Sequence, residues 1–534
     1  MAEVLNQTVM PDRHWHLAMP SSELAHHSAR MVRIAGKQIA FFNTETGIMA
    51  CDNRCPHEGY PLSEGSVSQS CTLTCNWHNW KFNLATGENL YGGDRLRTYP
   101  VETRGEDIWV DITELPFAER YKTVTDSLHD AFDDENYDRI AREIARLIKI
   151  GADPFDALRL SIEWSWQKLE FGWTHAYAGM ADWLRLYEEH QDDEELQLVC
   201  LAESVAHVAF DVLREKNYDF SSGVAEFDES TFLKYIENEN EVAAIAAIRG
   251  GIRDGLQFAD FEPALSSAAL AHYNDFGHSL IYVTKAKSLI ELLGKQVMEP
   301  LLLSLVRSLI FAPREDKIPE FRAYSDYLNK WGQHQNQRPE AGLWWHKSID
   351  KSMQVAVDSS GSSAEEIYQA LLLANAINLL NFEMEQQYKT HVTVSGNVGW
   401  LDFTHGLTFA SAVRQQCSRF PELWAQGLLQ MACFNGRNAG FTTDETDLDS
   451  WKSNDLDRQM NQLLERVLDH GQGEYIVSVH LLKTTLAVRE EIIRLNYSEA
   501  EILVAALTRL FESPIRRRQA RRVAHQSLQF VSKE

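Results

Sequence analysis

The sequence of 534 residues predicts a multidomain α+β protein, in which a small all-β domain precedes a large all-α domain. Three observations support this prediction. Residues 13–113 read as short β-rich runs between glycine-containing turns. From about residue 120 to the end, the apolar residues follow the 3.6-residue period of a helix. Similar helical segments also recur, which is typical of an array of repeated hairpins. We therefore expect domains at 1–115 and 116–534.

The strands of the first domain are visible as alternating or β-branched segments. The run "ARMVRIAGKQIAFFNTETGIMAC", which begins at Ala29, contains two β-rich stretches joined at "AGK" and a turn at "TETG". A further strand, "EDIWVDI", ends at Ile112 and alternates apolar with polar residues. These segments predict a compact antiparallel domain.

The helices of the second domain carry start and stop signals. Capping boxes are expected at Ser363–Glu366 and at Ser498–Glu501. The polar segment 312–348 interrupts the periodic pattern, and a loop of that length is uncommon inside a compact domain. It predicts two helical halves, 116–311 and 349–534, which this loop joins.

The charge and composition exclude several classes of function. A net charge of −26 disfavours nucleic acid or an anionic membrane surface as partner. The basic run Arg516–Arg522 is the local exception; we interpret it as a solvated terminal helix, with docking of an acidic partner or a phosphate as the alternative. Neither a secretory signal nor an apolar run of 18 residues is visible, and seven cysteines are too few for a disulfide framework. We expect a cytoplasmic protein with reduced thiols, and homo-oligomerisation stays open.

Two short motifs in the first domain predict a metal site. Its candidate ligands are spaced C-x-H, then seventeen residues, then C-x-x-H, and they are Cys55, His57, Cys75 and His78. A zinc finger usually pairs two cysteines first and places its histidines last. Here each half supplies one sulfur and one imidazole, which suits a [2Fe–2S] cluster whose irons take two thiolates and two histidines respectively. A structural zinc site of unusual spacing is the alternative.

Residues 13–113 resemble a Rieske iron–sulfur domain of the kind found in Rieske oxygenases and their ferredoxins. The segments "RCPHEGYPLSEGSV", "CNWHNWKFNLATGE" and "LRTYPVETRGEDIWVDI" carry the resemblance, in order and in spacing. The resemblance implies that Cys55, His57, Cys75 and His78 bind the cluster, which transfers single electrons. Asn79 is a departure, because the family usually has glycine at this position.

The resemblance also implies a low reduction potential. High-potential family members carry an additional disulfide at the positions of Tyr60 and Trp77, and hydroxyl donors where this chain has Trp80 and Phe82. Without these features, we expect the cluster near the low end of the range from about −150 to +300 mV.

The helical domain offers candidate ligands for a second metal. The catalytic iron motif of Rieske oxygenases, Asp-x-x-His-x(3–4)-His, does not occur in this chain. Instead, Asp275-Phe-x-His278 recurs as Asp402-Phe-x-His405, and each pair lies on one helix face. We predict a non-haem iron site at Asp275, His278, Asp402 and His405, with His278 and His405 as the catalytic residues. A dinuclear site would add carboxylates such as Glu163, Glu170 and Glu203, and a mononuclear site of two histidines and one carboxylate is also compatible.

A structural interpretation of these residues stays open. An aspartate three residues before a histidine is often a helix cap, and a histidine on an apolar face is often a core residue. This second interpretation applies above all to His175, His207 and His480, each of which stands alone on an apolar face. The helices around these histidines also resemble the questin-oxidase-like family, which is associated with oxidative cleavage of aromatic ketones.

These observations predict a Rieske-type oxidoreductase, most simply an oxygenase that uses O₂ on a small organic substrate. Because no glycine-rich nucleotide fingerprint occurs, we expect an external reductase or ferredoxin as electron donor. Two alternatives stay open. One is a non-catalytic electron-transfer or redox-sensing module whose helical domain binds a protein partner. The other is a reductase that does not use O₂.

Overall fold

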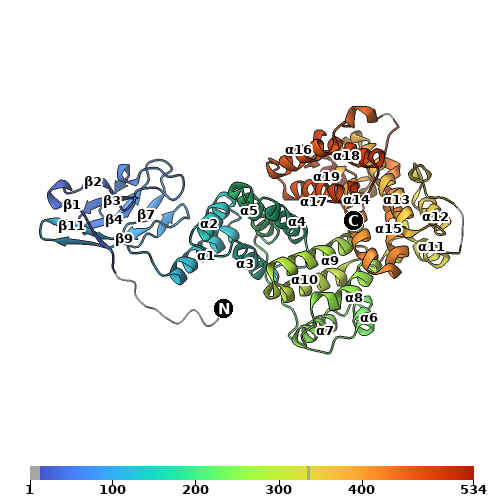
Figure 1. Cartoon of the computed structure of the whole chain (residues 1–534), viewed down its shortest axis with the longest axis horizontal. Helices are drawn as coiled ribbons and strands as arrows, with labels where there is room; N and C mark the ends of the chain where they lie inside the picture. The colour runs from blue at the N-terminus through green and yellow to red at the C-terminus, as the bar shows by residue number, and fades with distance from the viewer. Residues whose placement is uncertain (1–12, 334–336, 445) are drawn as a thin grey trace. The chain divides into compact units, whose positions relative to one another are not determined.

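The computed structural model describes residues 13–333, 337–444 and 446–534 and confirms the predicted fold class. The chain divides into two compact units: unit 1 ends at Ala157 and unit 2 begins at Leu158. The strands belong to unit 1 and are drawn in blue in Figure 1, whereas the rest of the chain is helical. Unit 2 continues to Glu534 without a further division.

Unit 1 contains three small antiparallel sheets with the strand orders β1-β11-β10, β2-β3-β4-β9 and β5-β6-β7-β8. Its strands are β1 (Trp15–Pro20), β2 (Ala29–Ile34), β3 (Lys37–Thr44), β4 (Gly47–Asp52), β5 (Ser66–Val67), β6 (Thr72–Thr74), β7 (Lys81–Asn83), β8 (Asn89–Tyr91), β9 (Thr98–Tyr99), β10 (Val101–Arg104) and β11 (Asp107–Asp111). One buried apolar cluster fills the space beside the β2-β3-β4 sheet, and another, which includes Leu73 and Phe82, lies beneath the predicted metal ligands.

Unit 1 also contains the helices α1 (Phe117–Asp133) and α2 (Tyr137–Lys149), so it extends beyond the expected boundary at residue 115. The reason is electrostatic. Asp94 is fully buried in the β domain, and its carboxylate is paired with Arg142 and Arg146 of α2. A buried carboxylate without these partners would be costly, so the helix completes the unit.

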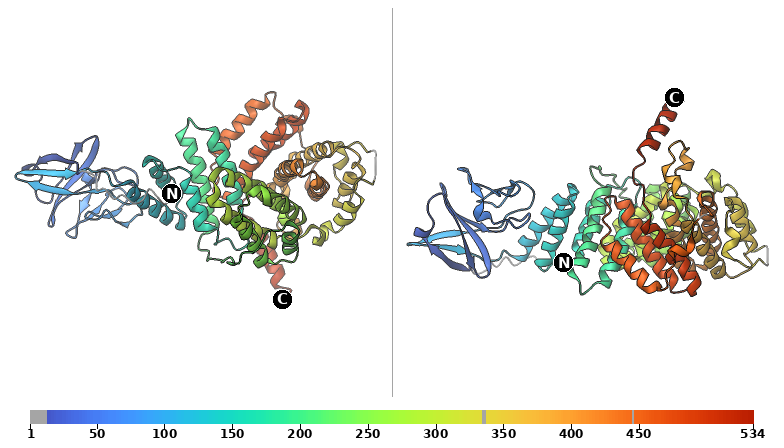
Figure 2. Two further views of the ribbon diagram at one scale, coloured as in Figure 1. Left: turned by 60° about the horizontal axis from the view of Figure 1, so that its bottom comes forward. Right: turned by 90° about the horizontal axis from the view of Figure 1, so that it is seen from above.

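Unit 2 consists of helices, as the views in Figure 2 show, and several of the segments between them contain short 3₁₀ turns. Its α-helices are α3 (Asp156–Ser165), which begins at the boundary, α4 (His175–Glu189), α5 (Glu194–Asp211), α6 (Glu229–Glu237), α7 (Glu241–Arg253), α8 (Phe258–Ala271), α9 (Asn274–Leu293), α10 (Met298–Phe311), α11 (Tyr324–Lys330), α12 (Ile349–Asp358), α13 (Ala364–Leu380), α14 (Trp400–Arg419), α15 (Trp424–Asn438), α16 (Leu456–Leu468), α17 (Tyr475–Ile492), α18 (Tyr497–Glu512) and α19 (Ala520–Val531).

Four of these helices form a closed ring. Helix α4 packs against α9, α9 against α14, α14 against α17, and α17 against α4. Other helices cover them from outside: α5 packs on α4, α8 and α10 on α9, α13 and α15 on α14, and α16 and α18 on α17. The repeated helical motif predicted from the sequence lies on α9 and α14, which are neighbours in this ring.

The predicted capping boxes and the predicted long loop agree with the structure to different degrees. Ser363 and Glu366 form the predicted capping box of α13. The box of α18 lies two residues earlier than predicted, at Asn496 and Glu499, because asparagine is as good an N-cap as serine. The segment 312–348 is only partly a loop, since it contains α11 and short 3₁₀ turns.

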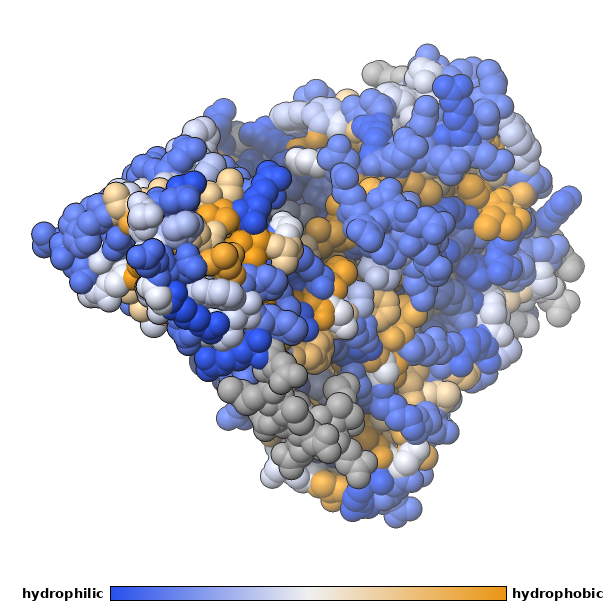
Figure 3. All heavy atoms as spheres, turned by 60° about the vertical axis from the view of Figure 1, so that its left-hand side comes forward, coloured by the Kyte–Doolittle hydropathy of each residue, from blue (hydrophilic) through white to orange (hydrophobic). Residues whose placement is uncertain are grey.

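The surface is mostly hydrophilic on the face drawn in Figure 3, where apolar residues stand in small groups. This agrees with the strongly negative net charge. Within the described ranges, none of the helices combines the length and apolar character needed to span a bilayer.

Candidate metal centres

Two loops of unit 1 present the four ligands that the sequence predicts, Cys55, His57, Cys75 and His78. The two loops contain the same turn. The N–H of Cys55 donates to the carbonyl oxygen of Tyr60 over 2.9 Å, and the N–H of Cys75 donates to that of Trp80 over 2.8 Å. Both cysteines are buried, and the backbone of each loop therefore holds its sulfur on the apolar side.

The fifth residue of each turn adopts a left-handed conformation. Gly59 has φ of 76° and Asn79 has φ of 61°, and the N–H of each donates back to the carbonyl of the ligand cysteine, over 2.8 and 3.0 Å. Asparagine is one of the few residues with a Cβ that visits this region routinely. The departure from glycine at position 79 therefore preserves the turn.

The two imidazoles lie nearer the surface than the sulfurs. The rings of His57 and His78 are 4.8 Å apart between centroids, and Trp80 stacks on His57 at 4.3 Å with an interplanar angle of 10°. Tyr60 and Trp77 stack on each other at 5.8 Å, so an aromatic contact joins the two loops at the positions where the disulfide is expected in high-potential relatives.

This donor set fits a binuclear cluster. Burial, together with the adjacent Cys75, raises the pKa of the Cys55 thiol to about 11, so a metal charge would be needed to hold the Cys55 sulfur as a thiolate. Two thiolates on the inner side and two imidazoles on the outer side match a [2Fe–2S] cluster with mixed ligands. The fold and this site define a small iron–sulfur electron-transfer domain.

The family model described as "Rieske [2Fe-2S] domain" matches residues 14–100. A 3-phenylpropionate/cinnamic acid dioxygenase ferredoxin subunit from Shigella boydii serotype 4 (strain Sb227) is 38% identical over 78 residues, which is 14% of this chain and 74% of the relative. The chain belongs to the Rieske family through its N-terminal domain, and the cofactor of that domain is a [2Fe–2S] cluster.

Two further comparisons give the extent of the similarity. A 4beta-methylsterol monooxygenase from Methylococcus capsulatus (strain ATCC 33009 / NCIMB 11132 / Bath) is 32% identical over 113 residues. This match covers 19% of the chain and 30% of the relative, so the chain spans less than a third of that protein's length. Among solved structures, the ferredoxin of carbazole 1,9a-dioxygenase from Nocardioides aromaticivorans IC177 is 21% identical with a TM-score of 0.17, over 18% of this chain and 95% of that chain.

Helix α2 contacts the first cluster loop directly. Nη2 of Arg146 donates to the carbonyl oxygen of Pro56 over 3.1 Å, and its Nη1 lies 2.5 Å from Asp94. Arg142 donates to the same carboxylate over 2.9 and 3.2 Å. Burial alone would raise the pKa of Asp94, but the two guanidinium groups outweigh burial and lower it. The buried ion pairs fix Arg146 where it holds the residue between two cluster ligands.

Unit 2 contains a second cluster of potential ligands, which we call the four-histidine group: His175, His278, His405 and His480. Each comes from one helix of the inner ring, α4, α9, α14 and α17 respectively. Their ligand nitrogens lie within 4.8 Å of one another. The Nε2 atom of His278 is 3.0 Å from that of His175 and 2.9 Å from that of His405. The Nε2 atoms of His405 and His480 are 3.2 Å apart.

The hydrogen bonds of these rings determine where their protons are. The Nδ1 atoms of His278, His405 and His480 face the carbonyl oxygens of Asn274, Leu401 and Ile476, over 2.9, 2.8 and 2.5 Å. A carbonyl oxygen only accepts, so Nδ1 carries the proton of each neutral ring and Nε2 is left with a lone pair. Three lone pairs therefore point at one another, an arrangement that a bound cation would stabilise.

The rings are neutral, which is the state that binds metals. Burial is the main cause of a lowered pKa at all four positions, and for His278 the pKa falls to about 3. Nitrogen atoms bound to one ion at about 2.0–2.1 Å lie roughly 2.9–3.4 Å apart. The Nε2–Nε2 separations of 2.9–3.2 Å between neighbouring rings agree with this spacing.

The candidate carboxylates do not join this group. Among the described residues, the ligand atoms that converge here are imidazole nitrogens only. Asp402 instead accepts from the N–H of Gly399 over 2.8 Å and forms the capping box of α14, and it lies 3.4 Å from Arg437. Burial raises the pKa of Asp275, with Arg437 acting in the opposite direction. Asp402 thus serves the start of α14, whereas α9 has no side-chain cap hydrogen bond at its N-cap.

The carboxylates considered for a dinuclear site also lie elsewhere. Glu203 pairs with His470 over 3.1 Å, and both Glu163 and Glu170 are exposed. His207 is buried and stacks on Tyr475 with ring centroids 5.1 Å apart, outside the four-histidine group.

Sequence reasoning assigned two members of the group, His175 and His480, to the core. The structure brings both beside His278 and His405. Only a weak signal was available: the segment "FGWTHAYAGMA" around His175 is a loose copy of the repeated motif, and His480 stands on an equally apolar helix. Neither has the preceding aspartate that made the other two conspicuous.

The backbone before His278 is strained. Asn274, Asp275 and Phe276 have φ of 45°, 47° and 61°, and Gly277 has φ of 80°. Consecutive non-glycine residues in this region cost of order 1–3 kcal/mol each, and such outliers cluster at functional sites. This irregular turn positions His278 so that its Nδ1–H donates a hydrogen bond to the carbonyl oxygen of Asn274.

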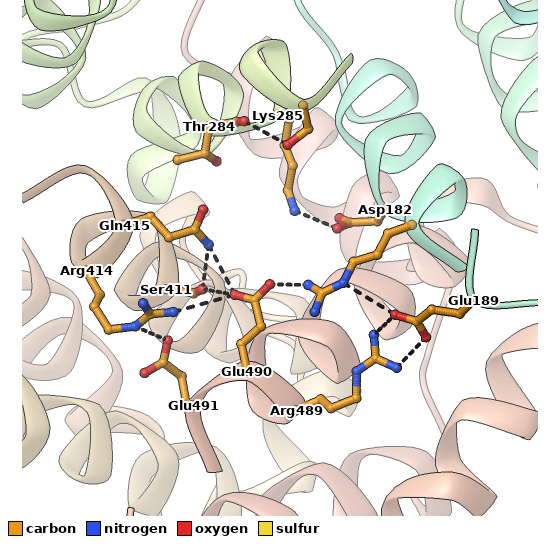
Figure 4. A network of polar contacts seen from close by, with 12 residues as sticks. Asp182, Glu189, Thr284, Lys285, Ser411, Arg414, Gln415, Arg489, Glu490 and Glu491 are labelled. Carbon is orange, nitrogen blue, oxygen red and sulfur yellow. Dashed lines mark hydrogen bonds and ion pairs between the residues drawn. The ribbon is translucent and has the colours of Figure 1, made fainter. Parts of the chain in front are cut away.

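A network of polar contacts joins the same four helices (Figure 4). Lys285 contacts Asp182 over 2.5 Å, and Glu490 accepts from Gln415 over 3.2 Å and pairs with Arg185. Three of these residues lie ten positions after a histidine of the group in their own helix: Arg185, Gln415 and Glu490. Because equal offsets meet on different helices, the inner helices run in the same direction, with the histidines towards their N-terminal ends.

A cavity of about 20 Å³ lies among the four helices, and its lining includes Lys285, Gln415 and Glu490 of this network. Thr284, Thr408 and Lys483 are among its lining residues. Burial lowers the pKa of Lys483 to about 7. The inner bundle thus contains, besides the imidazoles, a small polar cavity that the network of ion pairs lines.

Proposed function

We propose that the protein is a Rieske-type oxidoreductase in which the cluster supplies electrons to a non-haem iron bound by the four-histidine group, where O₂ oxidises a small organic substrate. An external reductase or ferredoxin donates the electrons. The cluster, when bound, takes up and releases one electron at a time.

The observation that carries this proposal is the convergence of imidazole Nε2 atoms that carry no proton, because the ring protons are on Nδ1. The Nε2 atoms of His278 and His405 are 2.9 Å apart, and each ring donates its Nδ1 proton to a backbone carbonyl. Structural histidines of a core normally use both ring nitrogens in hydrogen bonds of complementary polarity. Imidazole is a good ligand for iron, and four such ligands leave positions of an octahedral ion open.

The residues of the bundle have defined tasks in this proposal. The backbone carbonyls of Asn274, Leu401 and Ile476 fix the tautomers and orient the rings. The ion pairs below them, such as Lys285 with Asp182, keep the four helices in register. The burial of His278, His405 and His480 limits the access of bulk water to these ligands.

The test is metal and sulfide analysis of protein purified from iron-supplemented medium. We expect about three irons per chain, two of them with acid-labile sulfide in the cluster. The His405→Ala variant should hold about two irons, keep the Rieske EPR signal and lose O₂-dependent turnover. His207→Ala is the matched control, because His207 is equally buried but lies outside the group, and it should keep the third iron.

Two irons per chain in the wild type, unchanged by His405→Ala, would overturn the second centre. The non-catalytic electron-transfer module would then be the better explanation. Stoichiometric zinc without sulfide would overturn the assignment of the cluster as well.

A further inference from the structure

A cavity of about 250 Å³ lies at the N-terminal ends of α14 and α17. Its wall includes Leu401, Asp402, Ile476 and Val477, which stand one helical turn before His405 and His480 in their helices. Side chains of a helix lean towards its N-terminus, so the imidazoles lean towards this end of the bundle. The carbonyls of Leu401 and Ile476 also hold the two rings. The cavity therefore adjoins the proposed metal centre.

Three arginines line this cavity, Arg516, Arg517 and Arg522. The guanidinium of Arg522 donates to the backbone carbonyls of Lys389 and Gln386, over 2.9 and 2.8 Å. Arg517 is bonded to the amide oxygen of Gln472. The guanidinium of Arg516 lies over the ring of Tyr388, 5.1 Å from its centroid.

No carboxylate forms an ion pair with any of these three arginines within the part of the chain that the structure describes. This is unusual in a chain with a net charge of −26. Arg522 is buried, and burial together with the nearby Arg516 lowers its pKa. Three arginines against two carboxylates, Asp402 and Glu474, leave the lining of this cavity with an excess of positive charge, although Asp402 acts on Arg522 in the opposite direction to burial. Such an excess suits the binding of an anion.

The acidic groups that face the cavity do not supply this anion. Asp402 is occupied by the N–H of Gly399 and by Arg437, and Glu474 is exposed at the start of α17. The cavity also receives the positive ends of α14 and α17. In addition, the four-histidine group is neutral and would leave the whole charge of its metal uncompensated.

The remaining wall is apolar. Val398, Trp400 and Ile515 line it together with Leu401 and Ile476. A volume of about 250 Å³ is below the roughly 300–1,000 Å³ of sites for drug-sized ligands, so the occupant is compact.

We propose that this cavity binds the carboxylate of a compact organic acid, whose apolar body lies against Trp400 and the neighbouring aliphatic side chains, next to the four-histidine group. This inference rests on the proposed function, because it names the substrate class of that centre. It also assigns a role to the basic run Arg516–Arg522, which the sequence alone favours as a solvated helix.

The experiment is calorimetric titration of the full-length protein with benzoate, with benzyl alcohol as the uncharged analogue and inorganic phosphate as the anion without an apolar body. We expect benzoate to bind at least tenfold more tightly than either. The double variant Arg516→Gln/Arg517→Gln should weaken benzoate at least tenfold. The matched control is Arg518→Gln/Arg521→Gln, which removes two exposed arginines of the same run that do not line the cavity and should bind as the wild type does.

Equal binding of benzoate and benzyl alcohol, or an unchanged affinity in the Arg516→Gln/Arg517→Gln variant, overturns the inference. Phosphate binding as tight as benzoate binding contradicts the part of the proposal in which an apolar body contributes to binding. Circular dichroism confirms that both double variants are folded. Titration needs no turnover, so the metal content of the same sample distinguishes the two proposals. A third iron without benzoate binding contradicts only the proposed substrate class. Arginine-dependent benzoate binding without a third iron contradicts only the proposed metal centre.

Discussion

The guanidinium of Arg146 donates a hydrogen bond to the carbonyl oxygen of Pro56, which lies between the cluster ligands Cys55 and His57. The donor belongs to α2, beyond the segment 14–100 that matches the Rieske family. In this protein, a helix outside the β domain therefore takes part in holding a cluster loop.

We predict that Arg146→Gln weakens cluster retention. The variant loses the bond to Pro56 and one of the two cationic partners of the buried Asp94, and breaking such a buried pair costs about 3–5 kcal/mol. Iron and sulfide content after gel filtration, together with the melting temperature of unit 1, measures the effect. Arg33→Gln, on an exposed position of β2, should leave both unchanged.

The cluster should have a low potential for a Rieske centre. Tyr60 and Trp77 stack where a disulfide would tighten the two loops, and Trp80 stacks on His57 without offering a hydroxyl donor. We expect a midpoint in the lower half of the range from about −150 to +300 mV, falling as the pH rises. Protein-film voltammetry between pH 6 and 10 tests this, and a midpoint near the upper limit would contradict it.

The start of α9 should be sensitive to a single methyl group. A Cβ on Gly277 would lie 2.2 Å from the ring of Phe409, so Gly277→Ala must displace that ring and should reduce metal binding at the four-histidine group. We expect a loss of about 2–4 kcal/mol in the free energy of unfolding. Gly294→Ala, at the other end of α9, is the control: it also has positive φ but meets no atom closer than 3.8 Å, and it should cost about 1–2 kcal/mol and leave metal binding intact.

The stability of unit 2 should fall with rising pH through one buried carboxyl group. Burial raises the pKa of Glu315 well above its usual range, and neither carboxyl oxygen has a hydrogen-bond partner among the described residues. The folded state holds this proton more tightly than the unfolded state, so stability falls as the pH rises above the unfolded pKa of about 4.3. Glu315→Gln should therefore stabilise the protein at pH 8 and change little at pH 4. Urea unfolding at both pH values checks this, and an equal effect at both would contradict it.

The Rieske domain and its cofactor could be predicted because the candidate ligands are local in sequence. All candidate ligands between Cys55 and His78 come from two loops of one small β domain, so the spacing of cysteine and histidine along the sequence is enough to identify them. The role of Asn79 was not visible, since its left-handed backbone becomes apparent only when the turn is compared with the one at Gly59.

The second centre could be predicted only in part. The recurrence of Asp-Phe-x-His identified His278 and His405, but the same pattern suggested carboxylate ligands, whereas Asp402 caps its helix. Periodicity shows that a histidine lies on an apolar face; it does not show which other helices share that face. His175 and His480 belong to the group because α4 and α17 close the ring, a contact between segments about 300 residues apart.

That closure has a consequence for biosynthesis. The four cluster ligands emerge from the ribosome within one short stretch of chain, so unit 1 can receive its iron and sulfide early. The four-histidine group cannot assemble until α17 has been made, because His480 is its last member and the network at Glu490 must form to align it. Under the proposed function, metal insertion into unit 2 would therefore follow the synthesis of α17, and a chain truncated before α17 would keep the Rieske domain but lack the complete four-histidine group.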